Sequence, residues 1–416
     1  MAKNLTKKPK KLKLSTIIIV FVPVLIIILA VVFGNLDKGV RSGSPAVESV
    51  NWTALSDNYI ELKDSLKITT PGVYYLSGSL ENGNITVSTT GAVKLILNNV
   101  SIKNSSGPSI YIEESKLTTI ELAEGSENYL EDGSTYSGYD EKVSGVIYSV
   151  DDLTIEGSGK LTITGNYEDG IKGKDNVVIS GGTIEISVPD DGIHARDDLI
   201  IDGGTVSVKK SKEGLEATNV YINSGDISVT SSDDGINAVN SDETSFVLEI
   251  NGGNLTVNAG GDGLDSNGTI TFNGGTVTVN GPSDNGNSAV DSETGIFYNG
   301  GNLIALGSSG MVDTPRDSGS GNVISVFLAS QKPANTKVAL KTSSGETVLE
   351  TASAKTFTHL LLASSDLEQG KTYILYIDDE KYEEFTFSSN ITTVGTVTNG
   401  MNRMNGNAPS DSFQRR

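Results

Sequence analysis

Over residues 169–307 the apolar side chains alternate with polar ones in short runs that recur along the chain. Each run has apolar positions two residues apart, such as Val177 and Ile179. A period of two predicts β-strands rather than helices. A Gly-Gly or Ser-Gly pair separates the first two strands of each repeat, which predicts a tight corner there. This part of the chain is therefore expected to be all-β.

The repeat begins six times, and five of these starts are an acidic residue followed by glycine. The starts lie 21 to 28 residues apart, at Asp169, Asp191, Glu213, Asp234, Asp262 and Ser288. Three short strands in about 22 residues, joined by glycine corners, are typical of one coil of a parallel β-helix. At that length, residues 59–322 predict about eleven coils. The general chirality of parallel connections favours the right-handed form.

After Gly321 the glycine corners stop and longer alternating strands begin. Residues 323–389 have hairpin signals at Ser344–Gly345 and Gln369–Gly370. The pattern predicts a small antiparallel β-module that caps the open end of the solenoid, because exposed strand edges have to be covered. Residues 390–416 are rich in Asn, Gly, Ser and Thr, so we expect a disordered tail.

The amino-terminal end contains an uncharged apolar run from Leu14 to Phe33. As a helix this run is about 30 Å long, the thickness of the hydrocarbon core of a bilayer. Residues 1–13 carry six lysines and no acid, which predicts a cytoplasmic amino terminus. We expect a single-pass transmembrane helix or signal anchor over 14–34, a linker over 35–58 and an extracellular remainder, held at the cell membrane. A cleaved secretory signal is the alternative.

Composition and charge exclude several classes of protein. The chain has no cysteine, which excludes disulfide scaffolds, thiolate zinc sites and cysteine nucleophiles. Without the six lysines of the basic segment, 25 basic residues face 52 acidic ones, a formal charge of −27. Such a surface repels phosphate backbones and attracts cations. We therefore expect no nucleic-acid partner.

The acids at the repeat starts are expected to form files along the solenoid. Successive coils lie about 4.8 Å apart, where two carboxylates repel by roughly 3.5 kcal/mol at an effective dielectric near 20. The nearby lysines are too few, so we expect calcium, which takes roughly six to eight oxygen ligands, to neutralise them. The candidate ligands are Glu168, Asp169, Asp190, Asp191, Glu213, Asp233, Asp234, Asp262 and Asp265. The alternative is that the Asp-Gly pairs are turn residues only.

Three segments carry a resemblance to a known family. Leu95–Ile102, Ile120–Asn128 and Asp152–Leu161, together with the repeated Asp-Gly-Ile units, resemble the clostridial-type polysaccharide-lyase-like parallel β-helix carbohydrate-binding family. The resemblance covers about residues 55–400. It implies an exported, calcium-containing protein that binds cellulose, pectin or a similar polysaccharide without catalysis. Many members look like lipoproteins, whereas this chain has no cysteine.

Sugar binding requires aromatic faces on an exposed side of the solenoid. Tyr136 and Tyr139 lie in a Gly/Ser-rich insertion and Tyr167 in the following repeat, so these three are the candidate carbohydrate-binding residues. A chain of this charge is expected to bind an acidic polysaccharide through bridging calcium or a local basic patch. We expect the protein to act as a monomer.

Two other functions remain open at this point. A calcium-dependent pectate-type lyase needs a metal beside the substrate carboxylate and a basic residue as general base. The candidate bases are Lys172, Lys212 and Arg196, although these side chains are also explained as counter-charges of the acids. A structural surface adhesin or spacer is the second alternative. The sequence favours a binding protein without catalysis.

Overall fold

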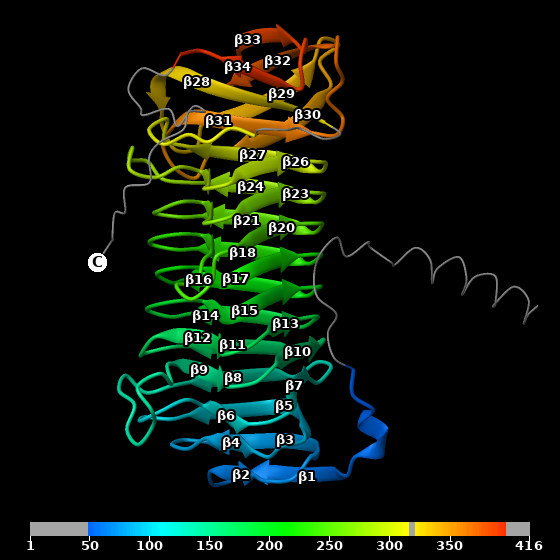
Figure 1. Ribbon diagram of the computed structural model, residues 1–416, viewed down its shortest axis with the longest axis vertical. Coiled ribbons are helices and arrows are strands. Elements are labelled where there is room, and N and C mark those ends of the chain that lie inside the picture. Colours follow the sequence, from blue (N-terminus) through cyan, green and yellow to red (C-terminus); the bar gives the residue numbers. More distant parts are fainter. Residues whose placement is uncertain (1–48, 316–320, 397–416) are drawn as a thin grey trace, which may run out of the picture. The chain divides into compact units, whose positions relative to one another are not determined.

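The computed structural model describes residues 49–315 and 321–396. Within these ranges the helical structure is limited to η1, a three-residue 3-10 turn (Trp52–Ala54). The remainder is a parallel β-solenoid of the right-handed type with about ten turns, followed by a C-terminal β-module (Figure 1). The parallel β-helix predicted from the repeat is confirmed, with about one turn fewer than expected.

Each turn contributes strands to three stacked parallel sheets, here named faces A, B and C. Face A contains β1 (Asp57–Leu62), the first halves of β3 (Gly72–Leu80) and β5 (Ala92–Lys103), β7 (Leu117–Leu122), β10 (Leu153–Gly157), β13 (Val177–Ile179), the second halves of β15 (Ile193–Ile201) and β17 (Leu215–Ile222), β20 (Val247–Ile250), β23 (Thr269–Phe272) and β26 (Gly295–Tyr298).

Faces B and C complete each turn. Face B contains the second halves of β3 and β5, β8 (Glu127–Glu131), β11 (Lys160–Thr164), β14 (Thr183–Ser187), β16 (Thr205–Lys210), β18 (Asp226–Thr230), β21 (Asn254–Asn258), β24 (Thr276–Asn280) and β27 (Asn302–Gly307). Face C contains β2 (Leu66–Ile68), β4 (Ile85–Ser88), β6 (Ile110–Glu114), β9 (Gly145–Ser149), β12 (Asp169–Gly173), the first halves of β15 and β17, β19 (Ile236–Ala238), β22 (Leu264–Ser266) and β25 (Val290–Ser292).

The core of the solenoid is a continuous column of aliphatic side chains. In β14, for example, Ile184 and Ile186 are fully buried, whereas the residues between and beside them are partly exposed. The inward residues of all three faces belong to one apolar cluster that runs from the first turn to the last. Because burial of apolar surface stabilises by about 25 cal/mol per Å², each turn depends on its neighbours for its stability.

The glycines of the repeat serve two different purposes. The second glycine of each Gly-Gly corner has a positive φ, as in Gly204 (81°) and Gly253 (77°), a conformation that favours glycine. The glycine after each repeat-start acid has no such φ. At Gly235 an added Cβ would lie 2.3 Å from Cγ1 of Val257 and 2.4 Å from the carbonyl oxygen of Gly263. The Asp-Gly pairs are therefore set by the close approach of successive turns, not by a left-handed turn.

The C-terminal module caps the last turn, as the sequence predicts. β31 (Phe357–Ser364) pairs antiparallel with β27 and with β28 (Asn322–Lys332), which pairs in parallel with β34 (Ile391–Val394). A second, antiparallel sheet contains β30 (Thr347–Ala352), β29 (Lys337–Thr342), β32 (Thr372–Ile377) and β33 (Glu380–Thr386). An apolar cluster of its own lies in this module. The first residues of the expected disordered tail, 390–416, are not disordered. Residues 391–394 form β34, since their main chain pairs with β28.

Several expectations concern residues that the structure does not describe. The basic segment 1–13, the apolar segment 14–34, most of the linker 35–58 and the tail after residue 396 lie outside the described residues. Among the residues that are described, no helix is long and apolar enough to cross a bilayer.

The stacking of the turns predicts that Gly235→Ala destabilises the protein. The new methyl group has to displace backbone of the next turn, and such overpacking costs about 1–3 kcal/mol. Gly286→Ala is the matched control, because the nearest atom to its added Cβ is the exposed Asp284 Oδ1 at 3.2 Å. Denaturant unfolding should give a lower midpoint for the first variant only. Equal midpoints for the two variants would contradict the close-approach explanation.

Candidate metal and carbohydrate site

Two parallel files of polar side chains run along face C. The acid file contains the repeat-start residues Asp169, Asp191, Glu213, Asp234 and Asp262. The mixed file contains the residue three positions later in each turn and extends one turn further, as Lys172, His194, Glu216, Asn237, Asp265 and Asp291. Members of the mixed file are direct Cα partners in successive turns. The regular register therefore brings the two files side by side over five turns.

The acid file is tied to the backbone of the following turn. The Asp191 amide donates to Asp169 Oδ1 at 3.2 Å, and the Asp262 amide donates to Asp234 Oδ1 at 2.7 Å. The Ser288 amide donates to Asp262 Oδ1 in the same way. Each of these three carboxylates thus has one oxygen fixed by the main chain, and its second oxygen is left for the mixed file or a ligand.

In the first two turns of the files, a lysine and a histidine side chain contact the acids. Lys172 Nζ lies 2.6 Å from Asp169 Oδ2, and His194 Nδ1 lies 2.9 Å from Asp191 Oδ2. Burial raises the pKa of Asp169, and the ammonium of Lys172 opposes that rise. Burial lowers the pKa of Lys172, but the adjacent Asp169 carboxylate outweighs it, so the net pKa is raised. This end of the files is an internal ion-pair network.

A carboxyl pair occupies the third turn. The side-chain oxygens of Asp191, Glu213 and Glu216 lie within 4.8 Å of one another. Burial and the hydrogen bond with Glu213 raise the pKa of Glu216 to about 10. Burial alone would raise the pKa of Glu213, but hydrogen bonds from Glu216, Asn237 and Lys212 lower it. At neutral pH the two glutamates therefore share a proton when no cation is bound.

The last turns bring three aspartates together without a basic partner. Side-chain oxygens of Asp234, Asp262 and Asp265 lie within 4.8 Å of one another. Burial raises the pKa of these carboxyl groups to about 6, 8 and 7 respectively. Among the residues that the structure describes, no Lys, Arg or His lies within ion-pair distance of the three. The protein therefore places no cationic side chain in contact with these three carboxyl groups.

Asn237 supplies a further oxygen next to these aspartates. Its side chain is buried, with 9% exposed, and its Nδ2 donates to Glu213 Oε2 of the preceding turn at 3.2 Å. Its Oδ1 has no hydrogen-bond partner. In the next turn, Asp265 is the Cα partner of Asn237. A buried oxygen without a partner costs about 1–3 kcal/mol, which a cation would offset.

An all-oxygen donor set of carboxylates and an amide fits a hard divalent cation such as calcium better than zinc or copper. The residues that fit are Asp234, Asp262, Asp265 and Asn237. Of the other predicted ligands, Asp191 and Glu213 lie in the preceding carboxyl group, and Asp169 is held by Lys172. Three more predicted ligands each come directly before a member of the acid file in the sequence and join none of these groups, namely Glu168, Asp190 and Asp233.

Glu216, His194 and Asn237 were not among the predicted ligands. The signal for them is present in the repeat, because the residue at the third position after the repeat start follows an inward aliphatic residue. Alternation then turns it outward, beside the acid of its own turn. Reading only the acidic residues of the repeat misses an amide and an imidazole at the same position.

The candidate lyase bases are engaged in ion pairs. Lys172 pairs with Asp169, and Lys212 Nζ lies 3.2 Å from Glu213 Oε1 and 4.0 Å from Asp190 Oδ1. Burial lowers the pKa of Lys212, but its hydrogen bond to Glu213 gives a net rise. Arg196 lies 3.8 Å from Asp242, on an exposed surface. A general base has to release its proton near neutral pH, and a raised pKa in both lysines opposes that.

The predicted carbohydrate-binding tyrosines come together at the amino-terminal end of face C. The rings of Tyr136 and Tyr167 stack with centroids 4.6 Å apart, and Tyr139 lies 5.9 Å from Tyr136. Tyr111 contacts Tyr139 edge-on at 5.3 Å and Tyr148 at 6.0 Å. We name these five residues the tyrosine cluster.

The tyrosine cluster is continuous with the mixed file. Tyr111, Tyr148 and Lys172 are Cα partners in three successive turns. The Tyr136 hydroxyl lies within hydrogen-bond distance of two acceptors, Asp132 Oδ2 at 2.8 Å and the Gly145 carbonyl at 2.9 Å, which fixes its ring. Face C therefore presents partly exposed aromatic rings at one end and buried carboxylates at the other.

Comparison with known proteins identifies the family. A family model described as a carbohydrate-binding domain-containing protein matches residues 63–246 and 220–354. The chain belongs to this carbohydrate-binding domain family. A protein of the same description from Acetivibrio thermocellus is 38% identical over 126 residues, which are 29% of this chain and 44% of that relative. The chain thus aligns with less than half the length of that relative.

A solved structure is also similar to this member of the carbohydrate-binding domain family. It is the polysaccharide lyase-like protein from C. thermocellum, as a gadolinium derivative, with 27% sequence identity and a TM-score of 0.46. The match covers 58% of this chain and 95% of that one. Family membership thus comes from the matched residues of the solenoid, which include both files and the tyrosine cluster.

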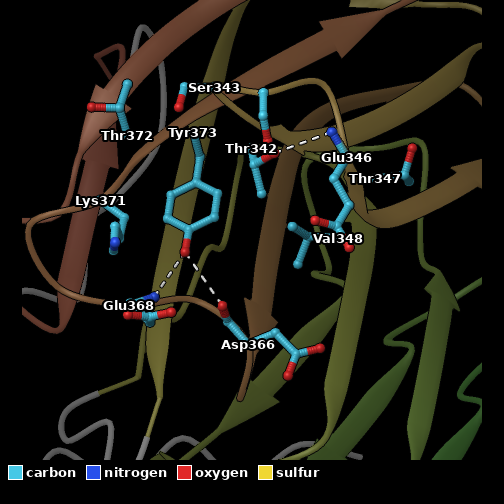
Figure 2. Close-up of a pocket in the computed structure, with 11 residues that line it drawn as sticks. Thr342, Ser343, Glu346, Thr347, Val348, Asp366, Glu368, Lys371, Thr372 and Tyr373 are labelled. Atoms are coloured by element: carbon cyan, nitrogen blue, oxygen red, sulfur yellow. Dashed lines mark hydrogen bonds between the residues drawn. The ribbon is translucent and has the colours of Figure 1, made fainter.

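A separate pocket lies in the C-terminal module (Figure 2). Its volume is about 410 Å³, and the β29–β30 hairpin and the segment from Asp366 to Tyr373 line it. The Tyr373 hydroxyl accepts from the Glu368 amide at 2.9 Å and donates to the Asp366 carbonyl at 3.3 Å. Most of its walls are exposed, and no lining residue belongs to the files or to the tyrosine cluster. This pocket is therefore separate from the candidate site on face C.

The raised pKa values predict how stability depends on pH in the presence of a chelator. The folded chain holds protons on Asp262 and Asp265 that the unfolded chain releases near pH 4. Their contribution to stability is complete below about pH 4 and is lost as the pH rises through about 7 to 8. Melting temperature should therefore fall between pH 5 and 8.5, and Asp262→Asn should flatten that fall. Asp64→Asn, on an exposed residue, is the control and should leave the slope unchanged, and an unchanged slope in both variants would refute this assignment.

Proposed function

We propose that this protein is a membrane-anchored extracellular polysaccharide-binding protein, which holds calcium on face C and binds acidic polysaccharide there without catalysis. Membership of the carbohydrate-binding domain family supports a carbohydrate as the ligand. The proposal that a cation binds is supported by the group of three aspartates without a basic partner, next to the unpaired oxygen of Asn237. We take the cation to be calcium because every available donor is an oxygen.

The charge of the protein makes a cation necessary for an acidic ligand. The chain outside its basic segment has a formal charge of −27, so a uronate carboxylate approaching face C is repelled. Calcium bound by Asp234, Asp262 and Asp265 would supply positive charge and further coordination positions for a sugar carboxylate. Asp234 and Asp265 are only partly buried, which leaves one side of the site open to solvent.

The tyrosine cluster supports binding of the polysaccharide over several turns. Aromatic rings stack on the C–H faces of pyranose rings because their π faces carry partial negative charge. Tyr139 and Tyr167 are partly exposed and lie in the connections that lead into face C, and Tyr139 contacts Tyr111 of that face. A linear polysaccharide laid along face C would contact the rings at one end and the cation at the other.

The paired lysines favour binding over cleavage. Both Lys172 and Lys212 form ion pairs with members of the acid file, and their raised pKa values keep them protonated. The proposed membrane anchor is based on the apolar segment 14–34 and the basic segment before it. The alternative role as an adhesin or spacer would need no ligand on face C.

Calcium binding has a direct test. The full-length protein, freed of metal by a chelator and dialysed, should give a saturable heat with calcium and melt at a higher temperature once loaded. Asp262→Asn with Asp265→Asn should weaken this binding by at least about tenfold, because two charged ligands are lost. Asp64→Asn is the control. Absence of heat and of any rise in melting temperature would refute the calcium proposal.

Glycan binding is tested with insoluble pectin and with soluble polygalacturonate. We expect retention on pectin in calcium, loss of retention with chelator, and loss in the Asp262→Asn, Asp265→Asn variant. Absorbance of unsaturated uronate is followed in the same samples. Its appearance would establish the lyase instead, and failure to retain the protein on any polysaccharide would support the adhesin or spacer.

A further inference from the structure

A pair of aromatic rings lies on face A, away from the files of face C. Tyr59 is 75% exposed and is the most prominent exposed apolar side chain among the described residues. Its ring stacks on that of Tyr75, with centroids 4.4 Å apart and planes 8° from parallel. Neither ring contributes to the core of the solenoid, because β1 and β3 turn them outward. An exposed, ordered aromatic stack of this kind marks a binding surface.

The only tryptophan of the chain lies beside this stack. The Trp52 ring, in η1, lies over Lys94 with 5.2 Å between its centroid and Nζ. Lys94 is itself fixed by ion pairs with Glu121 at 2.9 Å and Glu156 at 2.6 Å, and only 10% of its side chain is exposed. The indole therefore rests on a rigid support.

The register places Trp52 and the tyrosines on the same surface. In β5 the residues Val93, Leu95 and Leu97 point into the core, so Lys94 and Ile96 point outward together. Ile96 is the Cα partner of Tyr75, which is the partner of Tyr59. The indole over Lys94 and the two tyrosine rings thus lie on adjacent columns of the outer surface of face A.

We propose that Trp52, Tyr59 and Tyr75 form a second glycan-binding platform, on face A, that takes a neutral pyranose chain such as a β-linked glucan. This proposal rests on the proposed carbohydrate-binding function and adds a site of different chemistry. Flat aromatic faces stack on pyranose C–H groups, and nearby carboxylates accept hydrogen bonds from sugar hydroxyls. Trp52 and Tyr59 precede residue 63, where the family match begins, and Tyr75 lies within the match.

The charge around the platform favours a neutral ligand. Asp57 and Glu61 lie on β1, and Glu121 and Glu156 lie further along the face, whereas the basic partners are Lys63 and Lys94. The local charge is therefore negative, and a uronate chain is repelled here unless a cation is bound. Face A and face C are thus expected to separate neutral from acidic glycans, and only the second site depends on calcium.

Because Trp52 is the only tryptophan, its fluorescence reports on this platform alone. Cellohexaose is titrated into the full-length protein in the presence of chelator, and tryptophan emission is recorded. We expect a saturable change that calcium does not affect. Tyr59→Ala should weaken binding by at least about tenfold, and Tyr59→Phe, which keeps the ring, should restore it. Tyr376→Ala is the matched control, since Tyr376 also lies beside a lysine but in the C-terminal module.

The outcomes separate this proposal from the function of face C. Retention on pectin in calcium without any response of Trp52 to cellohexaose would overturn the platform and leave the proposed function intact. An equal response in Tyr59→Ala, with the melting temperature unchanged, would also overturn it. A response to oligogalacturonate that equals the response to cellohexaose in chelator would refute the assignment to neutral sugars. Loss of both pectin retention and the Trp52 response would refute the carbohydrate function itself.

Discussion

The register between successive turns is the constraint on which the whole structure depends. Each residue lies directly over its equivalent in the turn before, about 4.8 Å away, so whatever one turn carries is repeated along a face. Aliphatic residues become a continuous core in this way. At one corner, Asn251, Asn273 and Asn299 each donate to the asparagine of the preceding turn at 2.7–2.8 Å. On face C the same rule forces buried carboxylates together.

The interactions that reduce the repulsion between these carboxylates differ from turn to turn along face C. Lys172 and His194 pair with acids in the first two turns, and Glu213 and Glu216 share a proton in the third. In the last turns no basic side chain of the described residues lies within ion-pair distance of the aspartates, and Asn237 and Asp265 add oxygens instead. The change from basic to acidic residues at one repeat position therefore places the proposed cation site in the carboxyl-terminal part of the solenoid.

The repeat predicted most of the fold because a period of two and glycine corners follow directly from stacked strands. It did not show why glycine follows each acid, since contacts such as that of Gly235 with Gly263 join residues 28 positions apart. Asn237 could not be predicted from the acidic residues of the repeat, because its side chain is an amide without charge. Trp52 was assigned to a linker and Tyr59 had no role, because their positions over Lys94 and Tyr75 depend on tertiary register.

An anomalous-scattering map of crystals grown with calcium tests the central claim most directly. The register and the charges predict a peak bounded by Asp234, Asp262, Asp265 and Oδ1 of Asn237, and none between Asp169 and Lys172, where the ammonium already supplies the charge. A map with ordinary water between these aspartates, or with their carboxylates turned away from one another into solvent, would contradict the account.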